Sequence, residues 1–320
     1  MSNPYDLVAK VIFTHESGRK RSIEMFYTGR NTWRFRFCGS KLGKWIFRTV
    51  CDASDGTHGD GSLDNHVGRI TVTAQTDPLI NGFLSHKGNK FAIMDRDETD
   101  LKPYVYQVFM NQQDYEQQYN HASRIWDDPA KRRGLVADYW KNTVDNGFHI
   151  YYVALFYSWF KKGALDINML DTDDMTSPDP DVFDALEYAI QYAHQRGGRT
   201  HIWAWGDNDR KQTPNFLPGG VLGDVHKRLM RYMAARLGPL PGWCMNFGFD
   251  TIELPKPEAM ASEWANYLNA RMGWRHLLCA RGWNNSAFGI NSYAGFSCSY
   301  ELTTTRNGPS GYEEIIVDME

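Results

Sequence analysis

The chain lacks the short motifs that accompany nucleotide chemistry, serine hydrolysis and zinc binding. No G-x-S-x-G, Walker A or G-x-G-x-x-G pattern occurs, and Gly197-Gly198 and Gly219-Gly220 end or precede helical patterns rather than opening a phosphate-binding turn. The five cysteines have neither C-x-x-C nor C-x-x-H spacing, so neither a zinc knuckle nor a thioredoxin-like motif is present. These absences remove most of the support for a nucleotide-dependent enzyme.

A strong excess of one charge and a long apolar run are also missing. The formal net charge is −3, with acidic and basic residues interspersed, so there is no electrostatic footprint for nucleic acid. No apolar segment is long enough to cross a bilayer, and the first residues, MSNPYDLVAK, lack the basic and apolar regions of a signal peptide. We therefore expect no nucleic-acid or membrane partner. The expected location is cytoplasmic, or extracellular or periplasmic if a signal peptide has been removed.

Metal-binding patterns are weak. Asp207 and Asp209 in WAWGDNDRK lack the longer set of oxygen ligands and the distal Glu of a calcium loop. His58 and His66 lie among aspartates, but glycine and aspartate in this stretch also simply indicate a loop. His201 lies within an apolar strand pattern, where a buried structural histidine is expected. The sequence predicts neither a metal nor a cofactor.

The chain is long and rich in aromatic side chains. With 320 residues, 42% of them hydrophobic, it is long for one domain, so two domains, one barrel or both are expected. It contains 11 tryptophans and 17 tyrosines. Aromatic rings stack well on sugar faces, although they are also ordinary core and interface residues.

The first quarter of the chain has a β pattern. Short apolar or alternating segments separated by turn residues recur at the spacing that is typical of a small sandwich. The segments cover residues 7–13, 22–27, 33–37, 45–50 and 68–73. We predict an Ig-like β-sandwich over residues 1–77, followed by a linker and barrel lead-in over residues 78–103.

From residue 104 onward, buried-strand patterns alternate with helical patterns. The expected strands cover 104–110, 148–156, 200–205, 243–249, 277–280 and 294–299, and the expected helices 135–146, 181–196, 221–236 and 258–271. This alternation predicts a (β/α)8 TIM-type barrel over residues 104–320. Because a closed barrel needs eight strands, we expect a domain that is incomplete at its C-terminus after about six, or an open sheet if the strand register is wrong.

Polar and aromatic residues gather where the predicted strands end, which is where barrel enzymes carry their chemistry. They are Trp159, Trp205, Asp207, Asn246, Asp250, Glu253, Arg281 and Trp283. Planar rings, hydrogen-bonding groups and carboxylates together suit a sugar site. The plainer alternative is that Asp250 caps a turn and that Glu253 is solvated.

The N-terminal pattern also resembles a known family. NPY near the start and FYTGRNTWRFRFCGSKLGKWIFRT resemble the DUF5060 sandwich. The matching positions are Gly29, Trp33, Arg34, Arg36, Phe37, Gly43, Trp45, Phe47 and Thr49. In that family the sandwich precedes a (β/α)8 barrel of the apiosidase-like, DUF4038-type glycoside hydrolase group, so the resemblance implies the same arrangement here.

The resemblance extends to the fourth expected barrel strand. In those hydrolases this strand carries W-x-x-G-G-D or W-N-L-G-E-E, whose terminal acid protonates the leaving oxygen. The positions that fall on this pattern are Trp243, Asn246, Gly248 and Asp250. The resemblance therefore implies that Asp250 is the general acid/base, although Phe249 occupies a position that is Gly or Glu in the family. Glu253 is the competing candidate.

Hydrolysis through an oxocarbenium-like transition state also needs a second carboxylate. The resemblance places a nucleophilic Glu at the end of a seventh strand, beyond Glu320. Glu301 is the only acid at the sixth expected strand end and is a less favoured substitute. Without a second acid, the protein would bind sugar without cleaving it.

Together these features predict a glycoside hydrolase that cleaves a plant or algal polysaccharide, with Asp250 or Glu253 in the catalytic role. The expected substrate-binding residues are Trp159, Trp205 and Trp283 as stacking platforms, and Asp207, Asn246 and Arg281 as polar contacts. The sandwich is expected to pack against the barrel and to shape one side of the cleft. Two alternatives stay open: a non-catalytic carbohydrate-binding protein, and a polysaccharide lyase that uses Tyr or His as its base.

Overall fold

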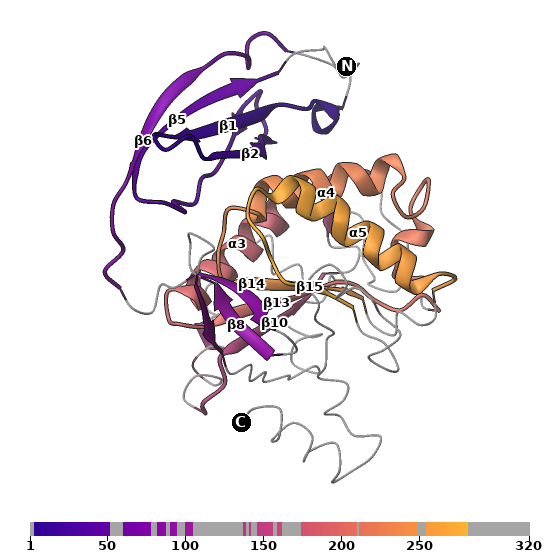
Figure 1. Cartoon of the computed structure of the whole chain (residues 1–320). Helices are drawn as coiled ribbons and strands as arrows, with labels where there is room; N and C mark the ends of the chain where they lie inside the picture. Colours follow the sequence, from indigo (N-terminus) through magenta and orange to yellow (C-terminus); the bar gives the residue numbers. More distant parts are fainter. Residues whose placement is uncertain are drawn as a thin grey trace.

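The structure is a computed structural model of the chain. It describes residues 3–51, 60–77, 82–87, 90–94, 100–104, 137–138, 141, 146–155, 159–161, 174–209, 211–248 and 254–280. Among these residues the chain forms mixed β-sheets and helices, arranged as an N-terminal β unit above a layer of helices that in turn covers a parallel sheet (Figure 1).

The N-terminal unit is built on a four-stranded antiparallel sheet, here called sheet A. Its strands are β1 (Lys10–His15), β2 (Lys20–Glu24), β5 (Gly43–Val50) and β6 (Val67–Val72), in the order β2-β1-β5-β6. A short turn of 3-10 helix, η1 (Pro4–Asp6), precedes it, and the strands β3 (Phe26–Tyr27) and β4 (Trp33–Arg34) pair beside it. The predicted strand at 33–37 is therefore shorter than expected, whereas the alternation along β1 and β5 is confirmed.

One face of sheet A is buried. Val11, Phe13 and Trp45 on this face have no exposed surface and pack with Phe37 and with Trp274, which follows the last described helix. Because alternate residues of a strand point to opposite faces, the residues between them lie on the other face of the sheet. The buried face therefore looks toward the rest of the molecule and the opposite face looks away from it.

Residues expected to be a linker and lead-in contain a small antiparallel sheet instead. This sheet C consists of β7 (Phe83–Lys87), β8 (Lys90–Met94) and β9 (Leu101–Pro103). Leu84 and Ile93 are buried against Cys244 and Leu277 of the parallel sheet region. Nearby Gly and Asn residues give this segment the sequence pattern of a loop. The burial of its apolar side chains nevertheless stabilises the short strands.

The second unit is a parallel sheet, here called sheet D. Its strands are β10 (Ile150–Ala154), β13 (Arg199–Trp205), β14 (Trp243–Gly248) and β15 (Leu278–Cys279), adjacent in sequence order and all parallel. Three helices connect them: α3 (Pro180–His194), α4 (Asp224–Leu237) and α5 (Pro257–Met272). Four predicted strands are thus confirmed, whereas the strand at 294–299, nearly all of that at 104–110 and most of the helix at 135–146 lie outside the described residues.

Local sequence signals explain where the helices begin and end. Asp179 caps α3 by accepting a hydrogen bond from the backbone N–H of Asp181, and Pro180 occupies the first helical position. The helix α4 begins three residues later than predicted, because Leu222 adopts a left-handed φ of 59° in the turn before it. The helix α5 ends at Gly273, whose φ of 71° is the left-handed C-terminal stop that glycine favours.

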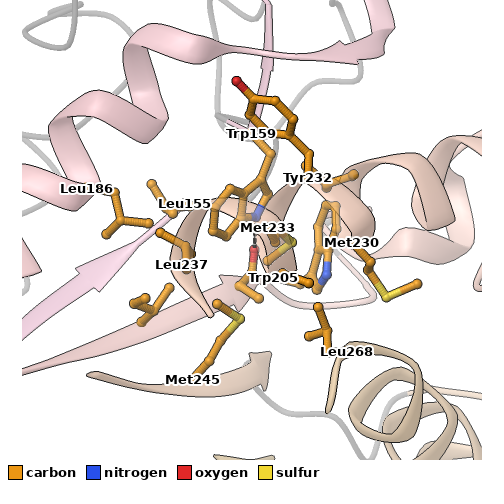
Figure 2. Packing of buried hydrophobic residues seen from close by; sticks show 14 of the residues in the cluster. Leu155, Trp159, Leu186, Trp205, Met230, Tyr232, Met233, Leu237, Met245 and Leu268 are labelled. Atoms are coloured by element: carbon orange, nitrogen blue, oxygen red, sulfur yellow. Dashed lines mark hydrogen bonds between the residues drawn. The ribbon is translucent and has the colours of Figure 1, made fainter. Parts of the chain in front are cut away.

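A large apolar core lies between sheet D and its helices. Figure 2 shows Trp159 and Trp205 within it, among Leu186, Met230 and Leu268. The Trp159 indole N–H donates to the carbonyl of Ala204 at 2.8 Å, which ties the segment after β10 to β13. The remaining short elements near this core are the paired strands β11 (Phe160–Lys161) and β12 (Asp174–Pro178), and the 3-10 turn η5 (Pro214–Phe216).

The N-terminal unit is docked on the helix layer through partly buried polar contacts. Arg36 donates through Nη2 to Glu187 Oε2 of α3 at 2.6 Å and through Nη1 to the carbonyl of Arg236 at 2.9 Å. Tyr232 of α4 donates its hydroxyl hydrogen to the carbonyl of Tyr27 at 3.0 Å. These contacts lie on the outward side of the helices, so they connect the N-terminal unit to the helix layer rather than to the ends of the parallel strands (Figure 1).

Candidate active site

The carboxyl ends of the strands of sheet D meet at one edge. The register pairs Ala154 with Trp203, Trp203 with Asn246, and Trp205 with Gly248. Strands that run parallel and in register end at the same level, so the carboxyl ends of β10, β13 and β14 lie side by side. This edge is where the sequence predicts the site.

One face of sheet D, opposite the helices, carries polar and aromatic side chains. His201 pairs with Cys244, and Trp203 with Asn246, so these side chains project from the same face of the sheet. Cys244 packs with Leu84 of sheet C, which places sheet C over this face near the amino-terminal end of β14. His201 and Trp203 are stacked, with ring centroids 5.6 Å apart and planes inclined by 18°. Asn246 therefore lies one step nearer the carboxyl edge than the covered Cys244.

Asn246 is completely buried and holds the end of β14. Its Oδ1 accepts a hydrogen bond from the backbone N–H of Gly248 at 3.1 Å. A buried amide side chain is retained only where it is hydrogen-bonded, and this bond fixes the backbone directly before residues 249–253. The predicted polar role of Asn246 is thus placed next to the segment that contains Asp250, although its contact with a substrate stays a prediction.

Two glycines allow the strand ends to approach each other. A Cβ at Gly248 would lie 3.1 Å from the carbonyl oxygen of Gly206, and a Cβ at Gly206 would lie 2.1 Å from Gln212 Oε1. Both positions therefore exclude larger side chains without local movement. Gly248 was part of the sequence pattern. The need for glycine at position 206 could not be predicted, because it depends on the position of the Gln212 side chain in the folded loop.

The loop after β13 is braced by amide groups. The backbone N–H of Gly206 donates to the carbonyl of Gln212 at 3.0 Å, and the N–H of Gln212 donates to the carbonyl of Asp207 at 2.9 Å. Asn208 Oδ1 accepts from Thr213 Oγ1 and from Asn215 Nδ2, both at 3.0 Å. The sequence alone did not point to Gln212, because its partners are set by the path of the loop.

The predicted acid Asp207 lies at the base of this loop. It is 8% exposed, whereas Asp209, two residues further on, is exposed. The surrounding hydrogen bonds give the loop a fixed shape at the edge of sheet D. Its contact with substrate stays a prediction, and it would involve a carboxylate that is largely enclosed.

Trp159 and Trp205 do not fit the stacking role predicted for them. Neither indole has any exposed surface, and the Trp205 ring meets His226 of α4 edge-on at 5.6 Å. A sugar can stack only on a ring face that solvent can reach, so we assign both rings to the core. The physical reason is that both rings bury their apolar surface in the core between sheet D and its helices (Figure 2). Four other predicted residues, Asp250, Glu253, Arg281 and Trp283, lie outside the described residues, as does Glu301.

Three buried histidines near the sheet and its helices are neutral at ordinary pH. Burial lowers the pKa of His201 and of His226 to about 3. Burial also lowers the pKa of His276 to about 4, although its Nε2 lies 2.7 Å from the carbonyl oxygen of Gly238. The expectation that His201 is buried is confirmed.

Clustered metal ligands and membrane-spanning helices are both absent from the part of the chain that the structure describes. No group of three or more His, Cys, Asp or Glu side chains in these ranges is arranged to hold a metal ion. No helix among the same residues is long and apolar enough to span a bilayer.

Comparisons with known proteins address the fold. Residues 1–52 match the domain of unknown function DUF5060, which confirms the resemblance noted for the N-terminal residues. No curated protein matches the chain. Among solved structures, the chain is similar to a "putative glycoside hydrolase" from Bacteroides vulgatus ATCC 8482, with 18% identity, a TM-score of 0.60, and coverage of 88% of this chain and 52% of the other. The chain thus spans about half the length of that protein and is similar to it in fold.

Two further structures are more distant. An endo-1,4-beta-mannanase from Rhizomucor miehei has a TM-score of 0.36 and 13% identity, covering 69% of this chain and 68% of the other. A beta-glucuronidase 2 from Bacteroides uniformis has a TM-score of 0.31 and 11% identity, covering 90% of this chain and 31% of the other. At these scores the similarity carries no argument about the present chain.

Proposed function

We propose that the chain is a glycoside hydrolase in which a DUF5060 sandwich precedes a (β/α)8 barrel of the apiosidase-like, DUF4038-type group, and that it cleaves a plant or algal polysaccharide. The observation that carries the proposal is the sequential order β10-β13-β14-β15, with parallel strands throughout. Right-handed crossovers between successive neighbours place every connecting helix on the same face, as in a barrel wall. A doubly wound sheet, whose strand order reverses, would have helices on both faces. Figure 1 shows α3, α4 and α5 together between sheet D and the sandwich.

Asp250 is the proposed general acid/base. It follows Gly248 by two residues, and Gly248 is held in place by Asn246 at the carboxyl end of β14. An acid at this point of a barrel strand is directed toward the open end, where a glycosidic oxygen could accept its proton. Glu253, three residues further on, is the competing candidate for the same role.

The reaction proceeds through an oxocarbenium-like transition state and needs a second carboxylate on the other side of the sugar ring. Glu301 or an acid beyond Glu320 would supply it, as nucleophile or as base. Asp207 and Arg281 would bind sugar hydroxyl or carboxylate groups, and Trp283 takes the stacking role that the buried Trp159 and Trp205 cannot fill.

The lyase alternative finds little support in the described histidines. A base that abstracts a proton near neutral pH works best with a pKa near that pH. Burial holds the pKa of His201 and of His226 at about 3, which makes both weak bases. The hydrolase proposal is therefore favoured over a lyase that relies on either of these imidazoles.

The test is product release from a panel of plant and algal polysaccharides by the full chain and by three variants. Asp250→Asn is expected to lower reducing-end release by about a hundredfold or more. Glu253→Gln measures the competing role, and the exposed Asp209→Asn at the same edge is the matched control, for which we expect near-normal turnover. Each variant is checked for an unchanged thermal unfolding midpoint. Full turnover by Asp250→Asn would contradict its role, unsaturated products absorbing in the ultraviolet would identify a lyase, and binding without products would identify a carbohydrate-binding protein.

A further inference from the structure

The outward face of sheet A carries an unusual set of exposed side chains. The register places Lys20, Thr14, Ile46 and Arg69 in one row across the four strands, and Ser22, Ile12, Arg48 and Val67 in the next. Lys10 and Lys44 extend the same face at either end. We call these ten residues the cationic face. Five of them are Lys or Arg, all five are exposed, and none forms an ion pair with a carboxylate among the described residues.

Carboxylates are few on this face. The exposed Glu16 follows β1 beside Lys44, to whose carbonyl its backbone N–H donates at 2.9 Å, and its carboxylate lies 4.0 Å from His15 Nε2. Glu24 pairs in register with Lys10, but it is buried and turned toward Arg271 at 3.5 Å and Arg231 at 3.9 Å, on the helices. Arg48 has a neutral partner, since its Nη1 donates to Asn65 Oδ1 at 2.9 Å. The face is therefore locally positive on a chain whose formal net charge is −3.

Protection of sheet edges does not explain the pattern. Lysine and arginine on edge strands discourage pairing with other chains, and Lys20 on β2 and Arg69 on β6 fit that role. Lys10 lies on β1, and Lys44 and Arg48 lie on β5, which are the two central strands of the sheet. Cations at these positions have no edge to protect, so they need another explanation.

Aliphatic side chains lie between the cations. Ile12, Ile46 and Val67 are 37%, 49% and 57% exposed, and the register places Ile12 and Val67 on either side of Arg48. A flat sheet that alternates apolar contact with single positive charges offers complementary groups to a chain of rings that bear spaced negative charges. Across four strands the face is roughly 14 Å wide, from three spacings of about 4.8 Å.

We propose that this cationic face binds an anionic polysaccharide, one that carries carboxylate or sulfate groups along its sugar chain. The choice of a sugar polymer rests on the proposed function, in which the same chain cleaves a polysaccharide. The face lies on the side of sheet A turned away from Trp274 and the helix layer, so it is a second binding surface, separate from the edge of sheet D.

Nucleic acid fits the face less well. A duplex presents one negative charge per about 1.7 Å of its axis and is met by dense basic patches on domains of high isoelectric point. Here the five cations are spread over the face, and the sequence isoelectric point is about 6.4. Single strands bind by stacking their bases on aromatic rings, and this face has no aromatic side chain.

The experiment measures binding rather than turnover. The full chain is titrated by calorimetry with polygalacturonate, with a neutral galactan, with single-stranded DNA and with anionic phospholipid vesicles, at low ionic strength and again with added salt. The same titration is repeated with Asp250→Asn, which is expected not to cleave the polymer. A failure of binding can then be distinguished from a failure of hydrolysis. Wild-type protein is expected to bind polygalacturonate preferentially and to lose affinity as salt screens the charges.

Two triple variants identify the surface. Lys44→Gln, Arg48→Gln and Arg69→Gln together should weaken polygalacturonate binding by about tenfold or more. The matched control, Arg30→Gln, Arg34→Gln and Lys102→Gln, removes the same charge from exposed positions off the face and should bind nearly as tightly as wild type. Equal affinity in both triple variants would overturn the proposal. Stronger binding of wild type to vesicles, to DNA or to the neutral galactan would overturn the choice of an anionic polysaccharide.

Discussion

Arg36 and Glu187 form a bidentate ion pair between the N-terminal unit and the helix layer. The guanidinium donates to both carboxylate oxygens, at 2.5 Å and 2.6 Å, although the residues are 151 positions apart in the sequence. Glu187 also accepts from Arg236 Nε, and Arg236 reaches Asp184 at 2.5 Å. A single buried carboxylate thus pairs with two guanidinium groups from different parts of the fold.

Replacement of Glu187 should destabilise the protein strongly. Glu187 is 5% exposed, and Glu187→Gln removes its charge while Arg236 stays buried, which costs about 3 kcal/mol of unfolding free energy when a buried pair is broken. Asp184→Asn is the matched control, because it removes a carboxylate from the same Arg236 at a side chain that is 61% exposed, with an expected cost below about 1 kcal/mol. Urea unfolding measures both, and equal losses would show that burial of Glu187 adds nothing.

The Trp159 indole should prove structural rather than sugar-binding. Trp159→Phe keeps an aromatic ring but removes the N–H that donates to Ala204, leaving a buried carbonyl without that donor. We expect a loss of about 1–3 kcal/mol in unfolding free energy. Should the protein prove to be a hydrolase, KM for polysaccharide is expected to stay unchanged. A raised KM with unaltered stability would instead restore the stacking role.

Gly206 should not tolerate a side chain. Its Cβ would lie 2.1 Å from Gln212 Oε1 and 2.7 Å from Gln212 Cβ, so Gly206→Ala forces the brace of the loop to move, at a cost of about 1–3 kcal/mol. Gly61→Ala is the control, since a Cβ there meets nothing within 4 Å and should leave stability unchanged or slightly higher. Thermal unfolding of both variants gives the comparison, and a stable Gly206→Ala protein would mean that the loop has room to adapt.

The sequence was most informative where one interaction dominates. The strand β13 is buried along its whole length and ends in an apolar run over residues 202–205, and the glycines before it and after α5 gave clear boundaries. Trp159 could not be assigned correctly, because an indole that follows a strand has the same local pattern whether its partner is Ala204 or a sugar. The ion pair between Arg36 and Glu187 and the hydrogen bonds of Gln212 could not be predicted either, since each depends on segments that only the folded chain brings together.

Buried histidines should make the protein sensitive to acid. Burial lowers the pKa of His226 from 6.5 to about 3, so between these values the unfolded chain binds a proton that the folded chain does not. Stability contributed by the neutral ring is therefore fully present above pH 6.5 and declines as pH falls toward 3, by about 2–3 kcal/mol at pH 4.5. His226→Asn removes this titration and retains an oxygen that can accept from the N–H of Leu222, as Nδ1 now does at 3.2 Å. The loss of unfolding free energy between pH 7 and pH 4.5 should therefore be about 2–3 kcal/mol smaller in the variant than in wild type. An equal loss in both proteins would show that His226 is already protonated in the folded protein at pH 4.5.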